Sequence, residues 1–102
     1  MYGQERFKTS TRLLKLSTSQ FRRQYKSGAV YHGEFDGNKR AGKGLFKWPN
    51  GACYDGEYMD NKRHGKGRQY FADGSSYDGD FVQDLRHGFG QLTWPDGEVS
   101  LT

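Results

Sequence analysis

Three glycine-bracketed basic segments are the first residues in this sequence whose types and spacing could do chemistry. They read "GNKRAGKG", "NKRHGKG" and "DLRHGFG", at residues 37–44, 61–67 and 84–90. A glycine-rich loop with a lysine can cradle a phosphate, but a P-loop also needs a serine or threonine after that lysine to bind Mg²⁺. Gly44 occupies that position, and Phe89 replaces the lysine of the third segment. We therefore expect no nucleotide site and no cofactor.

The other polar side chains do not favour catalysis or metal binding either. His64 and His87 lie at equivalent positions of two segments, but the first segment has Ala41 there, and Cys53 lies elsewhere in the unit. Pairs of carboxylates recur in every segment, at Glu34/Asp36, Glu57/Asp60 and Asp80/Asp84. A general acid and base are needed only once, so a recurring pair is typical of a recurring scaffold. The sequence predicts a protein that is not an enzyme and holds no metal.

A period of 23 residues explains the three segments. The same step separates successive members of two columns, Gly28, Gly51, Gly74 and Gly97, and Tyr31, Tyr54 and Tyr77. The units are residues 27–49, 50–72 and 73–95, with a partial unit at 96–102 and a basic tail at 1–26. Self-similarity at a fixed period indicates a repeat array.

Each unit contains two stretches with a period of two, which is typical of β-strands with one packed face. In Tyr31-His32-Gly33-Glu34-Phe35, for example, the aromatic residues and the glycine share one face. We expect loops at 37–43, 60–66 and 83–89 to join the strands of a unit. Tight turns at "WPNGA", "FADGS" and "WPDGE" then join the units. The predicted fold is all-β, a single-layer antiparallel twisted sheet of consecutive β-hairpins.

The repeated unit resembles the MORN repeat (membrane occupation and recognition nexus), whose pattern is roughly Y-x-G-x-[WF], a short loop and G-x-G-x-h-x-[WF]-x-x-G. Residues 27–95 carry it, in "YHGEF…GKGLFKW", "YDGEYMDNKRHGKGRQYF" and "YDGDFVQDLRHGFGQLTW". The resemblance implies a non-catalytic module for protein–protein and sometimes lipid-headgroup contacts. A lone cysteine favours a cytoplasmic location, and the resemblance adds the cytoskeleton of a cilium or flagellum, or a membrane surface.

Aromatic rings on one face of the predicted sheet suggest a binding function. A single sheet cannot bury both faces by itself, so the tail, a second copy or a partner must cover some of this face. We expect a helix or extended peptide of another protein to bind along this aromatic groove. The candidate contacts are Tyr31, Phe35, Tyr54, Tyr58, Tyr77 and Phe81. A mid-strand glycine such as Gly33 costs roughly 0.5–1 kcal/mol relative to alanine, and we expect a ring to lie flat on the backbone there.

The charge distribution suggests an alternative function. Residues 1–27 carry seven basic and one acidic group, and the remaining residues carry nine basic and eleven acidic groups. Together with the basic tail, basic side chains at equivalent positions of the loops could bind an anionic phospholipid surface. They are Lys39, Arg40, Lys43, Lys62, Arg63 and Lys66. We expect no nucleic acid partner, because the aromatic residues alternate with glycine at packing positions. Self-association through the last strand edge is a further hypothesis.

Three places depart from the regular pattern. Gln69 replaces the Phe46 and Leu92 of the other units, which predicts a locally wetter or shifted second hairpin. "DGEVSLT" at the end begins a fourth unit and stops. The tail allows disorder, a helix or a strand. Its apolar residues Phe7, Leu14, Phe21 and Tyr25 lie near one helical face, whereas "FRRQYKSG" could be a strand of a degenerate earlier unit.

Overall fold

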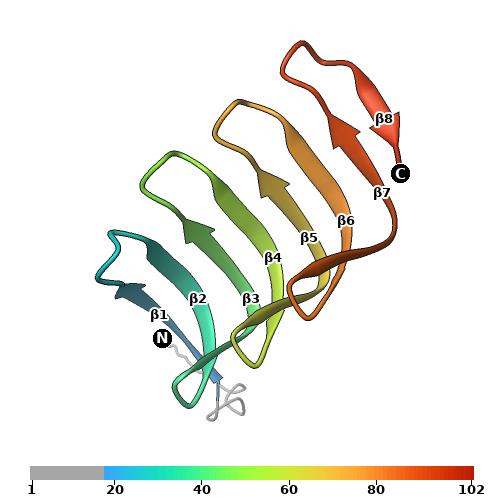
Figure 1. Ribbon diagram of the computed structural model, residues 1–102. Helices are drawn as coiled ribbons and strands as arrows, with labels where there is room; N and C mark the ends of the chain where they lie inside the picture. Colours follow the sequence, from blue (N-terminus) through green and yellow to red (C-terminus); the bar gives the residue numbers. More distant parts are fainter. Residues whose placement is uncertain (1–17) are drawn as a thin grey trace, which may run out of the picture.

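The computed structural model describes residues 18–102, which form one antiparallel sheet without a helix (Figure 1). Its strands follow chain order across the sheet: β1 (Thr18–Gln24), β2 (Val30–Asp36), β3 (Lys39–Lys47), β4 (Cys53–Met59), β5 (Lys62–Tyr70), β6 (Ser76–Val82), β7 (Leu85–Thr93) and β8 (Val99–Leu101). The predicted fold class is confirmed. Within this part of the chain no helix is long and apolar enough to cross a membrane. Predictions for residues 1–17 lie outside the described residues.

Two kinds of turn alternate along the array. Turns of two residues join the strands within each unit, and Asp60 and Asn61 have φ angles of 52° and 71° there. Positive φ at both positions is the type I′ geometry, whose twist matches that of the flanking strands. The predicted loops at 37–43, 60–66 and 83–89 are therefore wrong in length, because the second strand of each hairpin begins directly after the turn. Between units, a glycine with φ between 94° and 97° closes the turn, as predicted.

A bulge bends the second strand of each hairpin. Between β2 and β3 the register passes from Gly33↔Gly44 to Phe35↔Arg40, so Glu34 faces three residues of β3. Gly42, one of those three, has a φ of 67° that other residues rarely adopt. Similar register shifts occur between β4 and β5 and between β6 and β7. This positive-φ glycine made the start of β3 look like a loop in the sequence.

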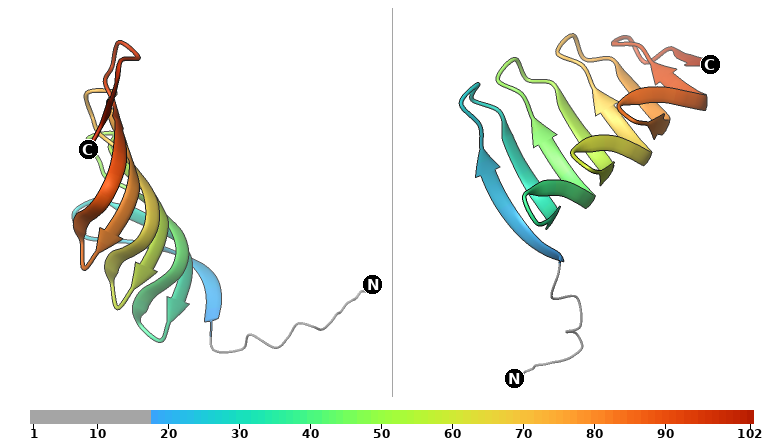
Figure 2. Two further views of the ribbon diagram at one scale, coloured as in Figure 1. Left: turned by 90° about the vertical axis from the view of Figure 1, so that its right-hand side faces the viewer. Right: turned by 60° about the horizontal axis from the view of Figure 1, so that its bottom comes forward.

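The bend makes the aromatic face of the sheet concave. Arg63 and Gln69 are six residues apart on β5, which is about 20 Å along a straight strand. Arg63 Nη1 nevertheless donates a hydrogen bond to Gln69 Oε1 at 2.8 Å. The two ends of the strand must therefore fold toward each other over the same face. The curvature of successive hairpins is visible in Figure 2.

Aromatic rings fill the concave face and form the core. Tyr54, which has no exposed surface, makes edge-to-face contacts with Tyr58 at 5.3 Å and with Phe81 of the next unit at 5.2 Å. The same arrangement joins Tyr31 to Tyr58 at 5.4 Å. Each ring column is thus continuous from one unit to the next, which holds the hairpins in register.

The segment just before the first unit is a strand. β1 pairs with β2 along all seven of its residues, from Thr18↔Asp36 to Gln24↔Val30. Tyr25, in the following turn, stacks on Phe46 with centroids 5.7 Å apart. Of the alternatives for this segment, the structure shows the strand, and the helical face through Phe21 and Tyr25 is wrong. Phe7 and Leu14 lie outside the described residues.

Candidate functional site

The tyrosine ring of each unit lies flat on two glycines. A Cβ atom added to Gly44 would collide with the Tyr31 ring, and one added to Gly67 would collide with the Tyr54 ring. The ring's hydroxyl then reaches a backbone carbonyl, because Tyr54 Oη donates to the Glu57 oxygen at 2.8 Å. The expectation that the mid-strand glycines make room for rings is confirmed.

This packing buries every aromatic residue predicted to contact a partner. None of the six, Tyr31, Phe35, Tyr54, Tyr58, Tyr77 and Phe81, is more than 6% exposed. Of the three covers expected for the aromatic face, a tail, a second copy or a partner, the described residues show the first in part, because Tyr25 of the predicted tail stacks on Phe46 and the Arg23 guanidinium lies 4.8 Å from the Phe35 ring centroid. The strands bend around the rings, and side chains from the turn end of each hairpin close over them. The six rings are the floor of the concave face, and a partner can reach only the residues above them.

Burial also changes the acidity of the core tyrosines. It raises the pKa of Tyr31 and of Tyr54 to about 12, and it raises the pKa of Tyr58 as well. The cause is that a phenolate loses its hydration inside the ring stack. Nearby arginines offset only part of this effect, Arg40 at Tyr31 and Arg63 at Tyr54. The rings are therefore neutral at physiological pH.

Arginine side chains cover the ring stack, Arg40 and Arg63 among them. The Arg40 guanidinium lies 5.0 Å from the Phe46 ring centroid and 5.2 Å from that of Tyr58. Arg63 lies 5.1 Å from the Phe81 ring centroid. A guanidinium over an aromatic face is attracted by the ring quadrupole and can stay partly buried there. The Arg40 Nε, which is buried without a hydrogen-bond partner, faces this aromatic environment.

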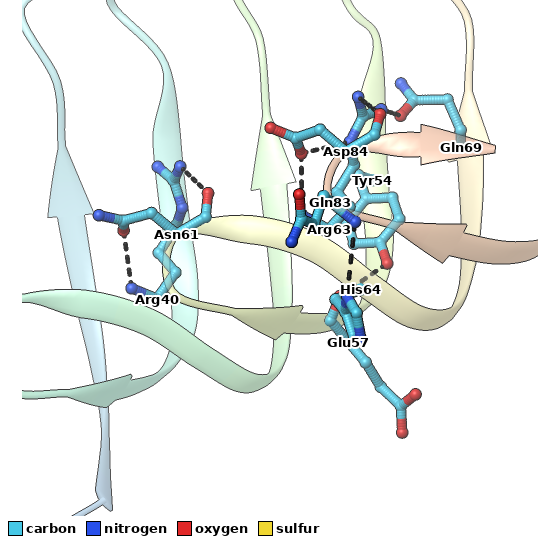
Figure 3. A network of polar contacts seen from close by, with 9 residues as sticks. All are labelled: Arg40, Tyr54, Glu57, Asn61, Arg63, His64, Gln69, Gln83 and Asp84. Carbon is cyan, nitrogen blue, oxygen red and sulfur yellow. Dashed lines mark hydrogen bonds and ion pairs between the residues drawn. The ribbon is translucent and has the colours of Figure 1, made fainter. Parts of the chain in front are cut away.

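The same arginines bind the turn of the next unit (Figure 3). Arg40 Nη2 donates to the Asn61 carbonyl at 2.7 Å, and the Arg40 amide donates to Asn61 Oδ1 at 2.8 Å. Arg63 makes the same two contacts with Asp84: its Nη2 donates to the Asp84 carbonyl and its amide donates to Asp84 Oδ1, each at 2.8 Å. Arg63 Nε also forms an ion pair with Asp84 Oδ1 at 3.1 Å. We call these contacts the Arg–Asx ladder. It joins residues 21 positions apart and fixes each hairpin to the next.

Gln69 keeps the second unit regular. It pairs with Tyr54 as Phe46 pairs with Tyr31, so the predicted shift of the second hairpin is wrong. Gln69 is only 7% exposed, so the predicted wetter environment is wrong as well. Gln69 Oε1 accepts a hydrogen bond from Arg63. At the equivalent position of the first unit, the Phe46 ring lies against the Arg40 guanidinium instead. The polar substitution is satisfied internally.

The six basic residues predicted to bind lipid divide into two groups. Arg40 and Arg63 face the concave side and are committed to rings and turns. The four lysines are exposed, and one of them, Lys66, forms an ion pair with Asp80 at 3.0 Å. Within residues 18–102, Lys39, Lys43 and Lys62 have no ion pair with a carboxylate. Of the predicted basic row, these three lysines are the exposed members without a carboxylate partner among the described residues.

A hollow on the concave side is the place that sequence reasoning missed. Phe71 and Gln69 line it together with Arg63, Phe81, Asp84, Leu85 and Arg86. Phe71 is 36% exposed, in contrast to the buried rings beside it. Position 71 is equivalent to Trp48 of the first unit, whose ring packs on the Phe46 ring with centroids 4.6 Å apart. The smaller ring at 71 and the polar Gln69 were the available signal for an opening here.

Chemistry at a metal or a catalytic pair has no support in the described part of the chain. No three His, Cys, Asp or Glu side chains converge among residues 18–102. His64 Nδ1 lies 3.4 Å from the Gln83 amide, which donates to it (Figure 3). Of the paired carboxylates, Glu57 Oε1 accepts from the Lys66 amide at 2.7 Å and Asp84 serves the Arg–Asx ladder. These carboxylates have structural partners.

Comparison with known proteins agrees with the repeat geometry. A protein-family model, the MORN repeat, matches three consecutive stretches, residues 31–53, 54–76 and 77–99. Their phase differs by four residues from the units taken from the glycine column, and the period is the same. A search of the curated proteins finds no match.

Proposed function

The chain belongs to the MORN-repeat family, whose modules serve binding and scaffolding, and on this premise we propose that it holds a segment of a partner protein on its concave face. The observation that supports this is the hollow around Phe71. Partly exposed apolar side chains stand there beside polar ones, above the buried ring of Phe81; the apolar ones are Phe71 and Leu85, and the polar ones are Arg63, Gln69, Asp84 and Arg86. Hollows in which apolar side chains lie beside placed polar groups are typical ligand sites. A helix or extended peptide fits this face as an elongated occupant.

The proposed contacts are the residues at the mouth of the hollow. Phe71 offers an apolar anchor point, and Arg63 and Gln69 offer polar groups beside it. The six buried rings contribute by fixing the positions of these residues. A partner segment therefore needs an apolar side chain for Phe71, with hydrogen-bonding groups flanking it.

Adjacent aromatic residues give a matched test of this proposal. Phe71 and Tyr70 are 36% and 38% exposed, but Tyr70 lies within 3.4 Å of Arg68, which pairs with Asp78 on the opposite face. A photo-crosslinking residue at 71 should capture a partner from native tissue, and one at 70 should not. The Phe71→Ser chain should lose that partner, and Tyr70→Ser should retain it. Equal capture at both positions, or equal binding by both folded variants, would refute the concave-face proposal.

Binding to an anionic membrane surface is a second candidate function. It is favoured by the exposed Lys39, Lys43 and Lys62, which have no carboxylate partner within residues 18–102. Each lysine near an anionic surface contributes on the order of 1 kcal/mol. Vesicles with 30% phosphatidylserine should sediment the chain, and Lys39→Glu combined with Lys62→Glu should reduce this. Sedimentation that does not depend on lipid charge or on salt would exclude this candidate.

A further inference from the structure

The convex face of the sheet, opposite the aromatic rings, carries a row of side chains that crosses the strands. Residues that pair directly across an antiparallel sheet project from the same face, so the strand register defines this row. Asp55 pairs with Arg68, and Arg68 pairs with Asp78. Arg68 Nη2 donates to Asp78 Oδ2 at 2.6 Å, and Arg68 Nε donates to the same oxygen at 3.2 Å. In this part of the row the arginine is therefore satisfied by a carboxylate of the chain itself.

Arg22 is the counterpart of Arg68 two periods earlier, but its partner in the row is different. Arg22 pairs with His32, at the position where the later units have Asp55 and Asp78. The first unit thus has an imidazole in place of the carboxylate that Arg68 binds. Within residues 18–102, Arg22 forms no ion pair.

A hollow of about 290 Å³ opens beside Arg22 on this face, where β1, β2 and β3 lie side by side (Figure 1). Three of its lining side chains are basic and three are large and apolar: Arg22, His32 and Lys47, and Val30, Leu45 and Trp48. No acidic residue of the described chain lines it. Asp55 lies across Leu45 from His32, and Glu34 accepts a hydrogen bond from the Lys43 amide at 3.1 Å. The hollow therefore combines positive charge with apolar surface and lacks a carboxylate from residues 18–102.

We propose that this hollow binds a carboxylate attached to an apolar group. The carboxylate takes the place beside Arg22 that Asp78 takes beside Arg68, because a planar guanidinium matches a carboxylate in geometry. His32 and Lys47 offer further N–H donors to it. The apolar group packs against Val30, Leu45 and Trp48. A free organic acid and the last residue of a polypeptide chain both present this chemistry, and the experiment below separates them.

The proposal is independent of partner binding in the hollow around Phe71. The two hollows open on opposite faces of the sheet and share no lining residue. None of Lys39, Lys43 and Lys62 lines the hollow at Arg22 either. Phe71→Ser should leave carboxylate binding unchanged, and Arg22→Gln should leave crosslinking at position 71 unchanged. Failure of one proposal therefore does not imply failure of the other.

The probe for the experiment is N-acetyl-phenylalanine, titrated into the ¹⁵N-labelled chain at constant ionic strength. The chain has two tryptophans, and Trp94 is the equivalent of Trp48 two units later. The acid should shift the indole signal of Trp48 and the amide signals of His32 and Leu45, while the indole signal of Trp94 stays in place. N-acetyl-phenylalanine amide, which keeps the apolar group and lacks the charge, should bind at least tenfold more weakly.

A tetrapeptide that ends in phenylalanine with a free carboxylate separates the two sources of the ligand. Binding of this peptide with the affinity of the acid or better identifies the end of a polypeptide chain. Binding of the acid alone identifies a free organic acid, because the hollow then has no room for the preceding residues.

Variants at exposed positions of the chain provide the controls. Arg22→Gln should weaken binding of the acid at least tenfold, whereas Arg68→Gln, at the equivalent position two periods later, should not change it. His32→Asp supplies the carboxylate that the later units have, so Arg22 should pair internally and binding should be lost. His32→Asn removes the imidazole without supplying a charge and should keep the affinity within about threefold. Circular dichroism verifies that each variant is folded.

Several outcomes would overturn the proposal. These are a Trp48 signal that does not move, equal binding of the acid and its amide, and parental binding by the Arg22→Gln or His32→Asp chain. Equal affinity for inorganic phosphate would also overturn it, since the apolar wall would then have no role. Glu5 is the one acidic residue of the sequence before position 18. If only the Glu5→Gln chain bound the acid, the protein would fill this hollow itself, and an external ligand would be excluded.

Discussion

Replacing Gly67 by alanine tests whether the packing of the Tyr54 ring requires a residue without a side chain beneath it. Gly67 is in β5 with an ordinary φ, so alanine there would by itself stabilise the strand by about 0.5–1 kcal/mol. The added Cβ collides with the Tyr54 ring, which is fully buried and has no free direction to move. Overpacking of this kind costs roughly 1–3 kcal/mol, and loss of the Tyr54–Glu57 hydrogen bond adds about 1 kcal/mol. We expect a net loss of about 2–3 kcal/mol.

Urea unfolding followed by tryptophan fluorescence and circular dichroism measures this loss. Gly37→Asn is the control, because no atom lies within 4 Å of its Cβ position and asparagine tolerates the φ of 64°. In a Tyr54→Leu background the same Gly67→Ala change should lose most of its cost, since the ring that it meets is gone. A Gly67→Ala chain as stable as the parent would refute the reasoning about ring and backbone.

Three further predictions concern the tyrosines and the Arg–Asx ladder. Burial raises the pKa of Tyr31 and Tyr54 from 10 to about 12. The contribution of these tyrosines to the free energy of unfolding is therefore fully present below pH 10 and is lost between pH 10 and 12, by roughly 2–3 kcal/mol per tyrosine. Denaturant midpoints measured at stepwise pH, together with phenolate absorbance, follow this loss. Asp84→Ala should lower the free energy of unfolding in urea by about 2 kcal/mol, because a hydrogen-bond acceptor is lost and alanine disfavours the positive φ of this position. Asp84→Asn should lower it much less, because Asn61 fills the same role one unit earlier. Arg63→Lys should destabilise the chain by about 1 kcal/mol despite the retained charge, because an ammonium cannot reproduce the several directed bonds of a guanidinium; an unchanged melting temperature would contradict this.

The repeat pattern determined the fold at the level of hairpins, and it failed where the chain bends. The 23-residue columns and the alternation around Tyr31 were sufficient to predict strands, their order and the packed face. The bulge at Gly42 was misread as part of a loop, since a positive-φ glycine looks the same in both contexts. Without that bend, the rings appeared uncovered and were assigned to a partner.

The roles of the arginines were beyond sequence reasoning for the same physical reason. Arg40 and Lys39 are neighbours in one basic cluster of the sequence, and only the strand's pleat sends them to opposite faces. Arg40 reaches the ring of Phe46 because the strand folds over, and it reaches Asn61 because the next hairpin lies alongside. A period of 23 residues indicates that units are neighbours, but it does not specify which atoms of neighbouring hairpins are in contact.

The contacts between neighbouring hairpins also determine how the molecule responds to a pull along its long axis. Substantial contacts join each strand only to the strands before and after it. No distant segment joins the two ends of residues 18–102, so tension is carried in series through every contact between neighbouring hairpins. We expect such an array to lengthen as hairpins separate one after another from its ends, and not in a single cooperative step.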